Sequence, residues 1–196
     1  MISFKNVSYN YPSATGVYDI NFDLEKNRLV VLMGPNGSGK STIFKLIEGL
    51  IQPNSGNLTY NNKNPDFLKL RQQVGLVFQN SSVQLFNDSV KEELAFGPQQ
   101  LGLSKEEIEK RVNDIVKLLS LEKLINRVPY QLSGGEQKLV AIGSILTMNP
   151  ALILLDEPLS GLSAKFQNKI LNLLTLLKKA GKTILISSHN FNQIKT

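Results

Sequence analysis

The stretch MGPNGSGKST, residues 33–42, combines glycines with a lysine and hydroxyl residues at a spacing that suits phosphate chemistry. It matches G-x-x-x-x-G-K-S from Gly34 to Ser41, between an apolar run and a segment of helical period, which is the context such a loop requires. Glycines let consecutive N–H groups face phosphate oxygens at the positive end of the following helix. Lys40 suits the β- and γ-phosphates, and the Ser41 hydroxyl suits Mg²⁺. A plain glycine-rich turn is the alternative, which the flanking strand and helix disfavour. The motif predicts nucleotide binding by Gly34, Asn36, Gly37, Ser38, Gly39, Lys40, Ser41 and Thr42.

Two adjacent carboxylates, Asp156 and Glu157, follow the apolar run LILL. Holding both at the end of a buried strand is costly unless a cation compensates their charge. Mg²⁺ bound with a nucleotide on the phosphate loop is the natural compensation. We therefore expect Asp156 to support the metal, and Glu157 to orient or deprotonate an attacking water. A solvated acidic turn is the alternative interpretation.

Two further polar residues follow apolar strands, where they would lie at the same edge of a parallel sheet. Gln79 follows VGLVF and offers a neutral oxygen ligand, and alone it means little. His189 is the single histidine and follows TILISS. A lone histidine is more often structural, but beside Lys40 and Glu157 it is predicted to contact the γ-phosphate.

The segment QLSGGEQK, residues 131–138, repeats the logic of anion binding elsewhere in the chain. Ser133 and Glu136 form a capping box, and Gly134 and Gly135 leave the N–H groups at the start of the helix open. A second phosphate-binding segment is redundant within one chain. We therefore expect it to face the nucleotide bound by another copy of the chain.

The elements that must position these residues alternate between apolar runs and segments of helical period, which is typical of a parallel sheet flanked by helices. Between Val83 and Asn149 no comparable apolar strand occurs, and Ser104 with Glu107 predicts a capped helix there. We expect strands near Ile2–Tyr9, Leu29–Met33, Val74–Phe78, Leu152–Leu155 and Thr183–Ser187, and helices over Ser41–Leu50, Lys105–Ser120, Glu136–Met148 and Ala164–Lys179.

Composition bounds the class of protein. The 196 residues suit one domain, and the apolar runs are too short to cross a membrane. The first residues alternate like a strand and do not resemble a cleavable signal. The absence of cysteine fits a reducing cytoplasm. The net charge of +6 would favour phosphates or an anionic membrane surface, although no compact run of Lys and Arg indicates nucleic-acid binding.

Over essentially its whole length the sequence resembles the ATP-binding-cassette family, because the phosphate loop, VFQN, LSGGE, LLDEP and His189 occur in that order. The resemblance implies an α/β fold with a P-loop NTPase parallel-sheet core, N-terminal antiparallel β-strands and an inserted α-helical subdomain. We expect one domain, 1–196, with core residues 1–82 and 149–196 and a helical signature subdomain over 83–148. The resemblance also implies a head-to-tail dimer with two ATP molecules. Gln79 would join Ser41 around Mg²⁺, Ser133, Gly134 and Gly135 would contact ATP across the interface, and Tyr11 would stack on adenine, with Tyr9 a weaker candidate.

The segment Gly75–Ser104, with VQLF and AFGP, is similar to ATPases of energy-coupling-factor importers, including the cobalt and nickel type. That likeness implies a second ATPase subunit, a transmembrane T-component and a substrate-binding membrane protein as partners, on the cytoplasmic face of the cell membrane. Another importer ATPase with a similar docking loop is one alternative. A soluble cassette acting on nucleic acid or ribosomes is another, and a weakly hydrolysing or regulatory subunit of a heterodimer is a third.

The sequence departs from the family pattern in four places. Leu139 stands where an arginine is usual, and Asn27 stands where a glycine is common. Ser163 replaces an aspartate that reaches across the dimer in the family. It keeps the role of N-cap for the following helix, because Ser and Asp cap about equally well. The sequence ends seven residues after His189, whereas members usually continue, so we expect a minimal or a truncated cassette.

Overall fold

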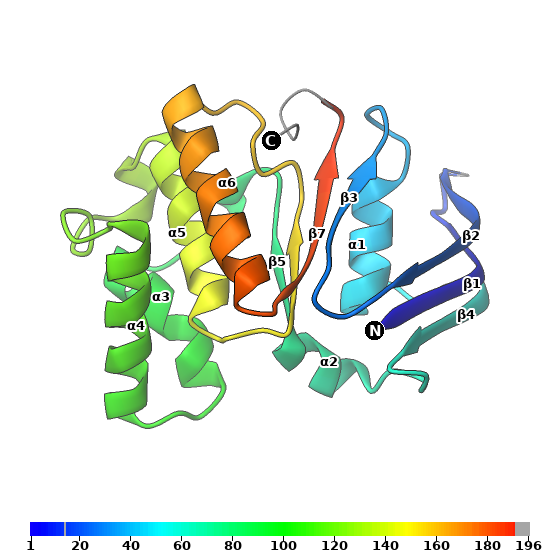
Figure 1. The fold of residues 1–196 in the computed structure, drawn as a ribbon, viewed down its shortest axis with the longest axis horizontal. Helices are drawn as coiled ribbons and strands as arrows, with labels where there is room; N and C mark the ends of the chain where they lie inside the picture. Colours follow the sequence, from blue (N-terminus) through cyan, green and yellow to red (C-terminus); the bar gives the residue numbers. More distant parts are fainter. Residues whose placement is uncertain (14, 191–196) are drawn as a thin grey trace. The chain divides into compact units, whose positions relative to one another are not determined.

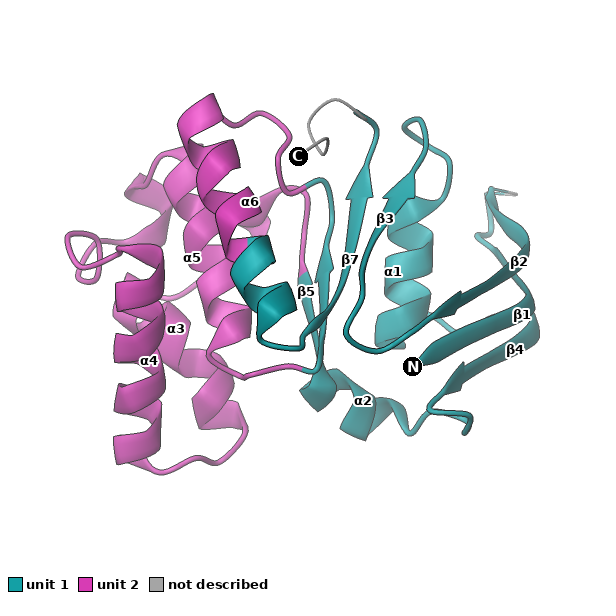
Figure 2. Cartoon of the chain, in the orientation of Figure 1, with its two compact units in different colours: residues 1–76, 151–157, 174–196 teal, residues 77–150, 158–173 magenta. Residues whose placement is uncertain are grey.

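The computed structural model describes residues 1–13 and 15–190. The chain separates into two compact units, coloured in Figure 2. Unit 1 comprises Met1–Leu76, Ala151–Glu157 and Leu174–Thr196, and unit 2 comprises Val77–Pro150 and Pro158–Leu173. The functional boundaries expected from the sequence, at 82/83 and 148/149, stay a prediction.

A parallel sheet of four strands carries the predicted phosphate loop of unit 1. Its strand order is β3-β7-β6-β5. β3 pairs with β7 in parallel from Leu29↔Ile184 to Met33↔Ser188, and β6 pairs with the other side of β7. The strands are β3 (Leu29–Met33), β5 (Val74–Val77), β6 (Leu152–Leu155) and β7 (Thr183–Ser188). All four were predicted as apolar runs, and β5 ends one residue before the expected Phe78.

A second, antiparallel sheet of unit 1 has the order β2-β1-β4 and shares a core with the first. α1 (Lys40–Glu48) lies between the two sheets in Figure 1, and its buried Phe44 and Leu46 belong to a core cluster that includes residues of both sheets. The strands are β1 (Ile2–Asn10), β2 (Gly16–Leu24) and β4 (Ser55–Tyr60), and α2 (Phe67–Gln73) precedes β5. The sequence predicts only β1 among these strands. β4 has the polar sequence SGNLTY, which gives no apolar pattern to recognise.

Unit 2 is mainly helical, as the sequence predicted. α3 packs against α4 and α5, which form its core. The elements are η1 (Ser81–Val83), α3 (Val90–Gln100), α4 (Lys105–Leu119), η2 (Pro129–Gln131) and α5 (Gly134–Leu146). α3 was not predicted, because Pro98 lies inside it and proline usually marks a helix end. α6 (Ala164–Lys179) is divided between the two units.

The sequence predicts N-terminal caps at three helices, with Ser133, Ser104 and Ser163 as the capping residues. Ser133 and Glu136 form both halves of a capping box. Ser104 accepts the N–H of Glu107, but the Glu107 carboxylate binds Arg111 at 2.9 Å, so the predicted box at that helix is only half made. The Ser163 carbonyl accepts the N–H of Gln167 at 3.0 Å, as expected of an N-cap residue. Among the described residues, none of the helices has the length and apolar character required to cross a membrane.

Candidate functional site

The predicted phosphate loop follows β3 directly and leads into α1. Gly39 precedes α1 with a φ of +92°, and a Cβ there would come within 2.3 Å of a Val17 methyl carbon, so the position requires glycine. Gly39 offers no side chain to cap α1. The N–H groups of the first helical turn are therefore presented at the positive end of the helix dipole, where an anion binds well.

Lys40 is buried and folded over this loop. Its Nζ donates to the carbonyls of Gly34, at 2.8 Å, and Pro35, at 2.9 Å. The same Nζ lies 3.6 Å from Oε1 of Glu157. The ammonium group thus lies between the carbonyls of the phosphate loop and the Glu157 carboxylate. Its predicted role at the β- and γ-phosphates stays a prediction.

A chain of hydrogen bonds joins the phosphate loop to the carboxylates. Ser41 donates to Oδ2 of Asp156 at 2.6 Å, and the buried Ser187 hydroxyl donates to Oδ1 of the same carboxylate. Ser187 also accepts the N–H of Glu157 at 2.8 Å. Ser187 was not identified from the sequence. The signal in the sequence is a hydroxyl residue that directly follows the apolar run ILI, residues 184–186.

Glu157 is 4% exposed and has an unusual backbone, with a φ of +46°. Its Oε2 lies 2.8 Å from Nδ1 of His189. Its Oε1 is buried and has no hydrogen-bond partner among residues 1–13 and 15–190. A positive φ is costly in a glutamate, and strained backbone positions of this kind cluster at functional sites. Glu157 therefore presents one carboxylate oxygen toward Lys40 while the other is held by His189.

The donor set around Ser41 fits Mg²⁺. One hydroxyl and one carboxylate lie within hydrogen-bond distance of each other, and both are the hard oxygen ligands that this ion prefers. Mg²⁺ is commonly held by one or two protein groups together with phosphate oxygens. Oε1 of Glu157 lies 3.6 Å from the Lys40 ammonium in the same unit and has no hydrogen-bond partner among the described residues.

Tyr11, the predicted adenine contact, lies in the same unit. Its ring makes an edge contact with Tyr9, with 4.9 Å between centroids, and Lys45 Nζ lies 5.8 Å from its centroid. The rings of Tyr11 and Tyr9, the two candidates from the sequence, are thus adjacent. Stacking of Tyr11 on adenine stays a prediction.

The other predicted contacts belong to unit 2. Ser133 and Gly134 are exposed at the start of α5, and the Ser133 hydroxyl donates to Glu136 at 2.6 Å. A Cβ on Gly135 would overlap the Phe166 ring at 2.5 Å, so α5 requires glycine there. The Gln79 side chain is exposed. Leu139, which stands where an arginine is usual, is buried in the apolar interior.

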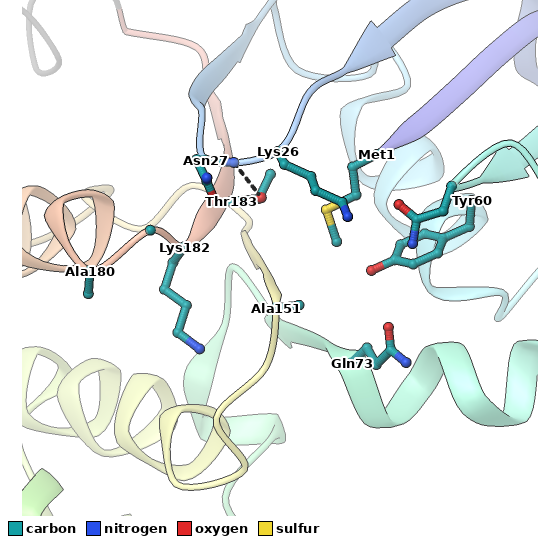
Figure 3. Close-up of a pocket in the computed structure, with 11 residues that line it drawn as sticks. Met1, Lys26, Asn27, Tyr60, Gln73, Ala151, Ala180, Lys182 and Thr183 are labelled. Atoms are coloured by element: carbon teal, nitrogen blue, oxygen red, sulfur yellow. Dashed lines mark hydrogen bonds between the residues drawn. The ribbon is translucent and has the colours of Figure 1, made fainter.

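A separate pocket of about 330 Å³ occurs at the opposite, N-terminal end of the parallel strands (Figure 3). In that view Lys26, Tyr60 and Gln73 point into the space beside Ala151. Asn27, the second departure from the family, has a φ of +58° and donates its backbone N–H to Thr183 at 3.0 Å. A glycine or asparagine suits that left-handed position. The pocket lies away from the predicted nucleotide contacts.

A phosphate loop at the end of a parallel strand, beside a buried Asp–Glu pair, defines the class of P-loop nucleotide hydrolases. The family model described as ABC transporter matches residues 17–160. The chain belongs to the ABC transporter family and is an ATPase of that class, which confirms the resemblance and the predicted fold class.

Similar proteins carry informative names. All of this chain aligns with 85% of the nickel import ATP-binding protein LarO of Lactiplantibacillus plantarum, at 47% identity. It is 43% identical to the energy-coupling factor transporter ATP-binding protein EcfA of Methanococcus maripaludis, over 99% of this chain and 72% of that protein.

Two solved structures share the fold. The cbiO1 structure from Clostridium perfringens, described as part of the ABC transporter complex cbiONQ, superposes with a TM-score of 0.89 at 34% identity, over 98% of this chain and 80% of that one. The cassette MJ0796, a dimer in a post-hydrolysis state bound to ADP and Pi, has a TM-score of 0.89 at 32% identity, over 98% and 90% of the two chains.

Proposed function

We propose that this chain is the ATP-hydrolysing subunit of a membrane importer of the energy-coupling-factor type. The proposal is supported by the names of the relatives and by one local observation. Glu157 has one carboxylate oxygen held by His189 and the other buried without a hydrogen-bond partner among the described residues. Such a group is prepared to accept a proton from a bound water.

The hydrolytic step assigned to these residues is simple. Water attacks the γ-phosphorus of ATP, its proton passes to Oε1 of Glu157, and the bond from the γ-phosphorus to the bridging oxygen breaks to release ADP and phosphate. Lys40 and the N–H groups of residues 34–42 bind the phosphates. His189 keeps Glu157 oriented and contacts the γ-phosphate.

We propose Ser41, Gln79 and Asp156 as the residues that hold Mg²⁺. When bound with ATP, the ion neutralises part of the charge on the β- and γ-phosphates. We further propose that Ser133, Gly134 and Gly135 of one copy contact the ATP held by its partner, and that Tyr11 stacks on adenine. Dimer closure on ATP and reopening after hydrolysis would drive transport.

Unit 2 offers a surface suited to a membrane partner. Val83 is 71% exposed and Phe86 is 65% exposed, and the Phe86 ring packs edge-on against Phe96 with 4.9 Å between centroids. We define these three residues as the apolar patch. Contiguous exposed apolar side chains can mark interaction sites, and the Phe86–Phe96 contact makes this surface contiguous at the two rings. We propose that the patch contacts the transmembrane component at the cytoplasmic face of the membrane.

The catalytic part is tested by phosphate release from Mg-ATP. Glu157→Gln should slow turnover by at least ~10²-fold, because it cannot accept the proton. The exposed Glu25→Gln is the control and should leave the rate unchanged. Equal turnover in wild type and Glu157→Gln would contradict the proposal.

The transport part is tested by purifying the tagged chain from membranes of its own cells. Small integral membrane proteins should co-purify with the wild type and be reduced with Phe86→Ser. Ribosomes or nucleic acid as the main co-purifying material would favour the soluble alternative and refute the importer assignment.

A further inference from the structure

The segment Phe78–Asn87 of unit 2 connects β5 with α3 and carries two features of the proposed function. Gln79 lies at its beginning, and Val83 and Phe86 of the apolar patch lie toward its end. Connecting segments are usually the mobile parts of a fold. This one is instead held at both ends by buried charged side chains.

Lys138 of α5 holds the first end. Its side chain is 3% exposed, and its Nζ donates to the carbonyls of Phe78, at 2.9 Å, and Gln79, at 2.7 Å. A buried ammonium requires such acceptors, because an unpaired charge is expensive in the interior. The same helix begins with Ser133, Gly134 and Gly135, so Lys138 links the signature helix to the backbone at Gln79.

Glu93 of α3 holds the second end. It is also 3% exposed, and its Oε2 accepts the backbone N–H groups of Phe86 and Asn87 and the side-chain amide of Asn87, each at 3.0 Å. Hydrogen bonds to the ionised form stabilise a buried carboxylate. Lys138 therefore binds carbonyl groups of the segment, and Glu93 binds its N–H groups. Each charged side chain matches the polar groups at its own end of the segment.

Between these ends the segment closes on itself. Gln84 Oε1 accepts the N–H of Phe78 at 3.0 Å, and Asn80 caps η1 by accepting from Ser82. Both η1 and α3 pack against α5. The segment is thus attached to α5 and α3 at its beginning, at η1 and at its end.

We propose that Lys138 and Glu93 are positioning residues that make Phe78–Asn87 a rigid element of α3 and α5. A displacement of α5, when the Ser133–Gly135 turn binds nucleotide, then moves Gln79 and the apolar patch together. The role of that displacement in transport rests on the proposed function. The rigidity of the segment does not depend on it. A flexible segment would transmit no such movement.

The rigidity is tested by amide hydrogen exchange in the protein without nucleotide. Lys138→Met keeps the length of the stem but removes the donors, and it should raise exchange over residues 78–89 by at least ~10-fold. Glu93→Gln should raise exchange at Phe86 and Asn87 by a smaller factor. Exchange in α1 should stay as in the wild type. The exposed Lys117→Met and Glu109→Gln are matched controls in the same unit.

The positioning role is tested by kinetics. Lys138→Met should lower kcat by about 10-fold while ATP affinity changes by less than about threefold, because Lys40 and Ser41 are untouched. Lys138→Arg retains donors and charge, so it should restore kcat and the exchange protection. Unchanged exchange over 78–89, or raised exchange with unchanged kcat, would overturn the proposal. A wild type without ATPase activity would refute the proposed function, and the exchange data would still show whether Lys138 and Glu93 make Phe78–Asn87 rigid.

Discussion

Nδ1 of His189 lies 2.8 Å from Oε2 of Glu157, so the single histidine of the chain holds the carboxylate that is proposed to accept the proton. His189 is partly exposed, whereas Glu157 is buried. The contact leaves Oε1 as the oxygen that faces Lys40.

Replacing this histidine tests the relationship directly. His189→Ala should lower kcat by about 10²-fold, because Glu157 loses its orienting partner and the γ-phosphate loses a contact. Binding of ATP, measured by titration, should change little. Asn190→Ala alters the neighbouring side chain and serves as the control. An unchanged kcat in His189→Ala would show that the contact has no part in turnover.

Ser187 forms hydrogen bonds with both Asp156 and Glu157, so its replacement should lower the free energy of unfolding. Ser187→Ala removes the donor to Asp156 and leaves the buried N–H of Glu157 unpaired. We expect the free energy of unfolding to fall by about 2–3 kcal/mol. Urea denaturation would measure it. Ser188→Ala removes a hydroxyl that bonds the neighbouring Asn190 backbone, and this variant should cost less than half as much. Equal losses would contradict a special role for Ser187.

Glu48 predicts a pH dependence of stability. Burial raises the pKa of Glu48 from its usual 4.5 to about 7, with Arg71 acting in the opposite direction. Its Oε2 has no hydrogen-bond partner among the described residues. The folded state therefore binds the proton more tightly than the unfolded state, so stability is greatest below pH 4.5 for this group and falls as pH rises to about 7.

The matching experiment compares Glu48→Gln with the wild type. The rise in pKa corresponds to at most about 3 kcal/mol, because each pKa unit is worth 1.36 kcal/mol. The variant should therefore be the more stable protein at pH 8 and lose that advantage toward pH 5. Melting temperatures across this range would show it, and parallel curves for the two proteins would argue against a raised pKa.

Ser163 bears on communication between two copies. Ser163→Asp restores the acid usual in the family and should strengthen ATP-driven dimerisation by about 10- to 100-fold, since a charge-assisted hydrogen bond is worth about 1.5–3 kcal/mol. Sedimentation in a Glu157→Gln background would measure it. The helix should be unaffected, because both residues cap it well. Equal dimer affinities would leave Ser163 with a capping role only.

The chemistry of the candidate site could be read from the sequence wherever it is local. Gly34 to Ser41 is a contiguous loop, so the glycines, Lys40 and the start of the helix are necessarily close together. The same holds for Ser133 and Glu136, whose capping box was predicted and is confirmed. Elements with weaker local patterns were missed. α3 contains Pro98, and β4 has few apolar residues.

That the chain is an α/β nucleotide-binding cassette follows from its motifs alone, because that class needs short motifs in a fixed order. Which of the distant groups meet depends on the folded core. Ser41 and Asp156 are 115 residues apart and bond because β3, β7 and β6 are neighbours in register. The pairing of these strands also brings the Ser187 hydroxyl to the N–H of Glu157. In unit 2, packing of α5 brings the Lys138 ammonium to the carbonyl of Gln79. Hydrophobic period specifies that strands and helices form, but the order of the strands and the pairing of buried polar groups depend on how the whole core packs.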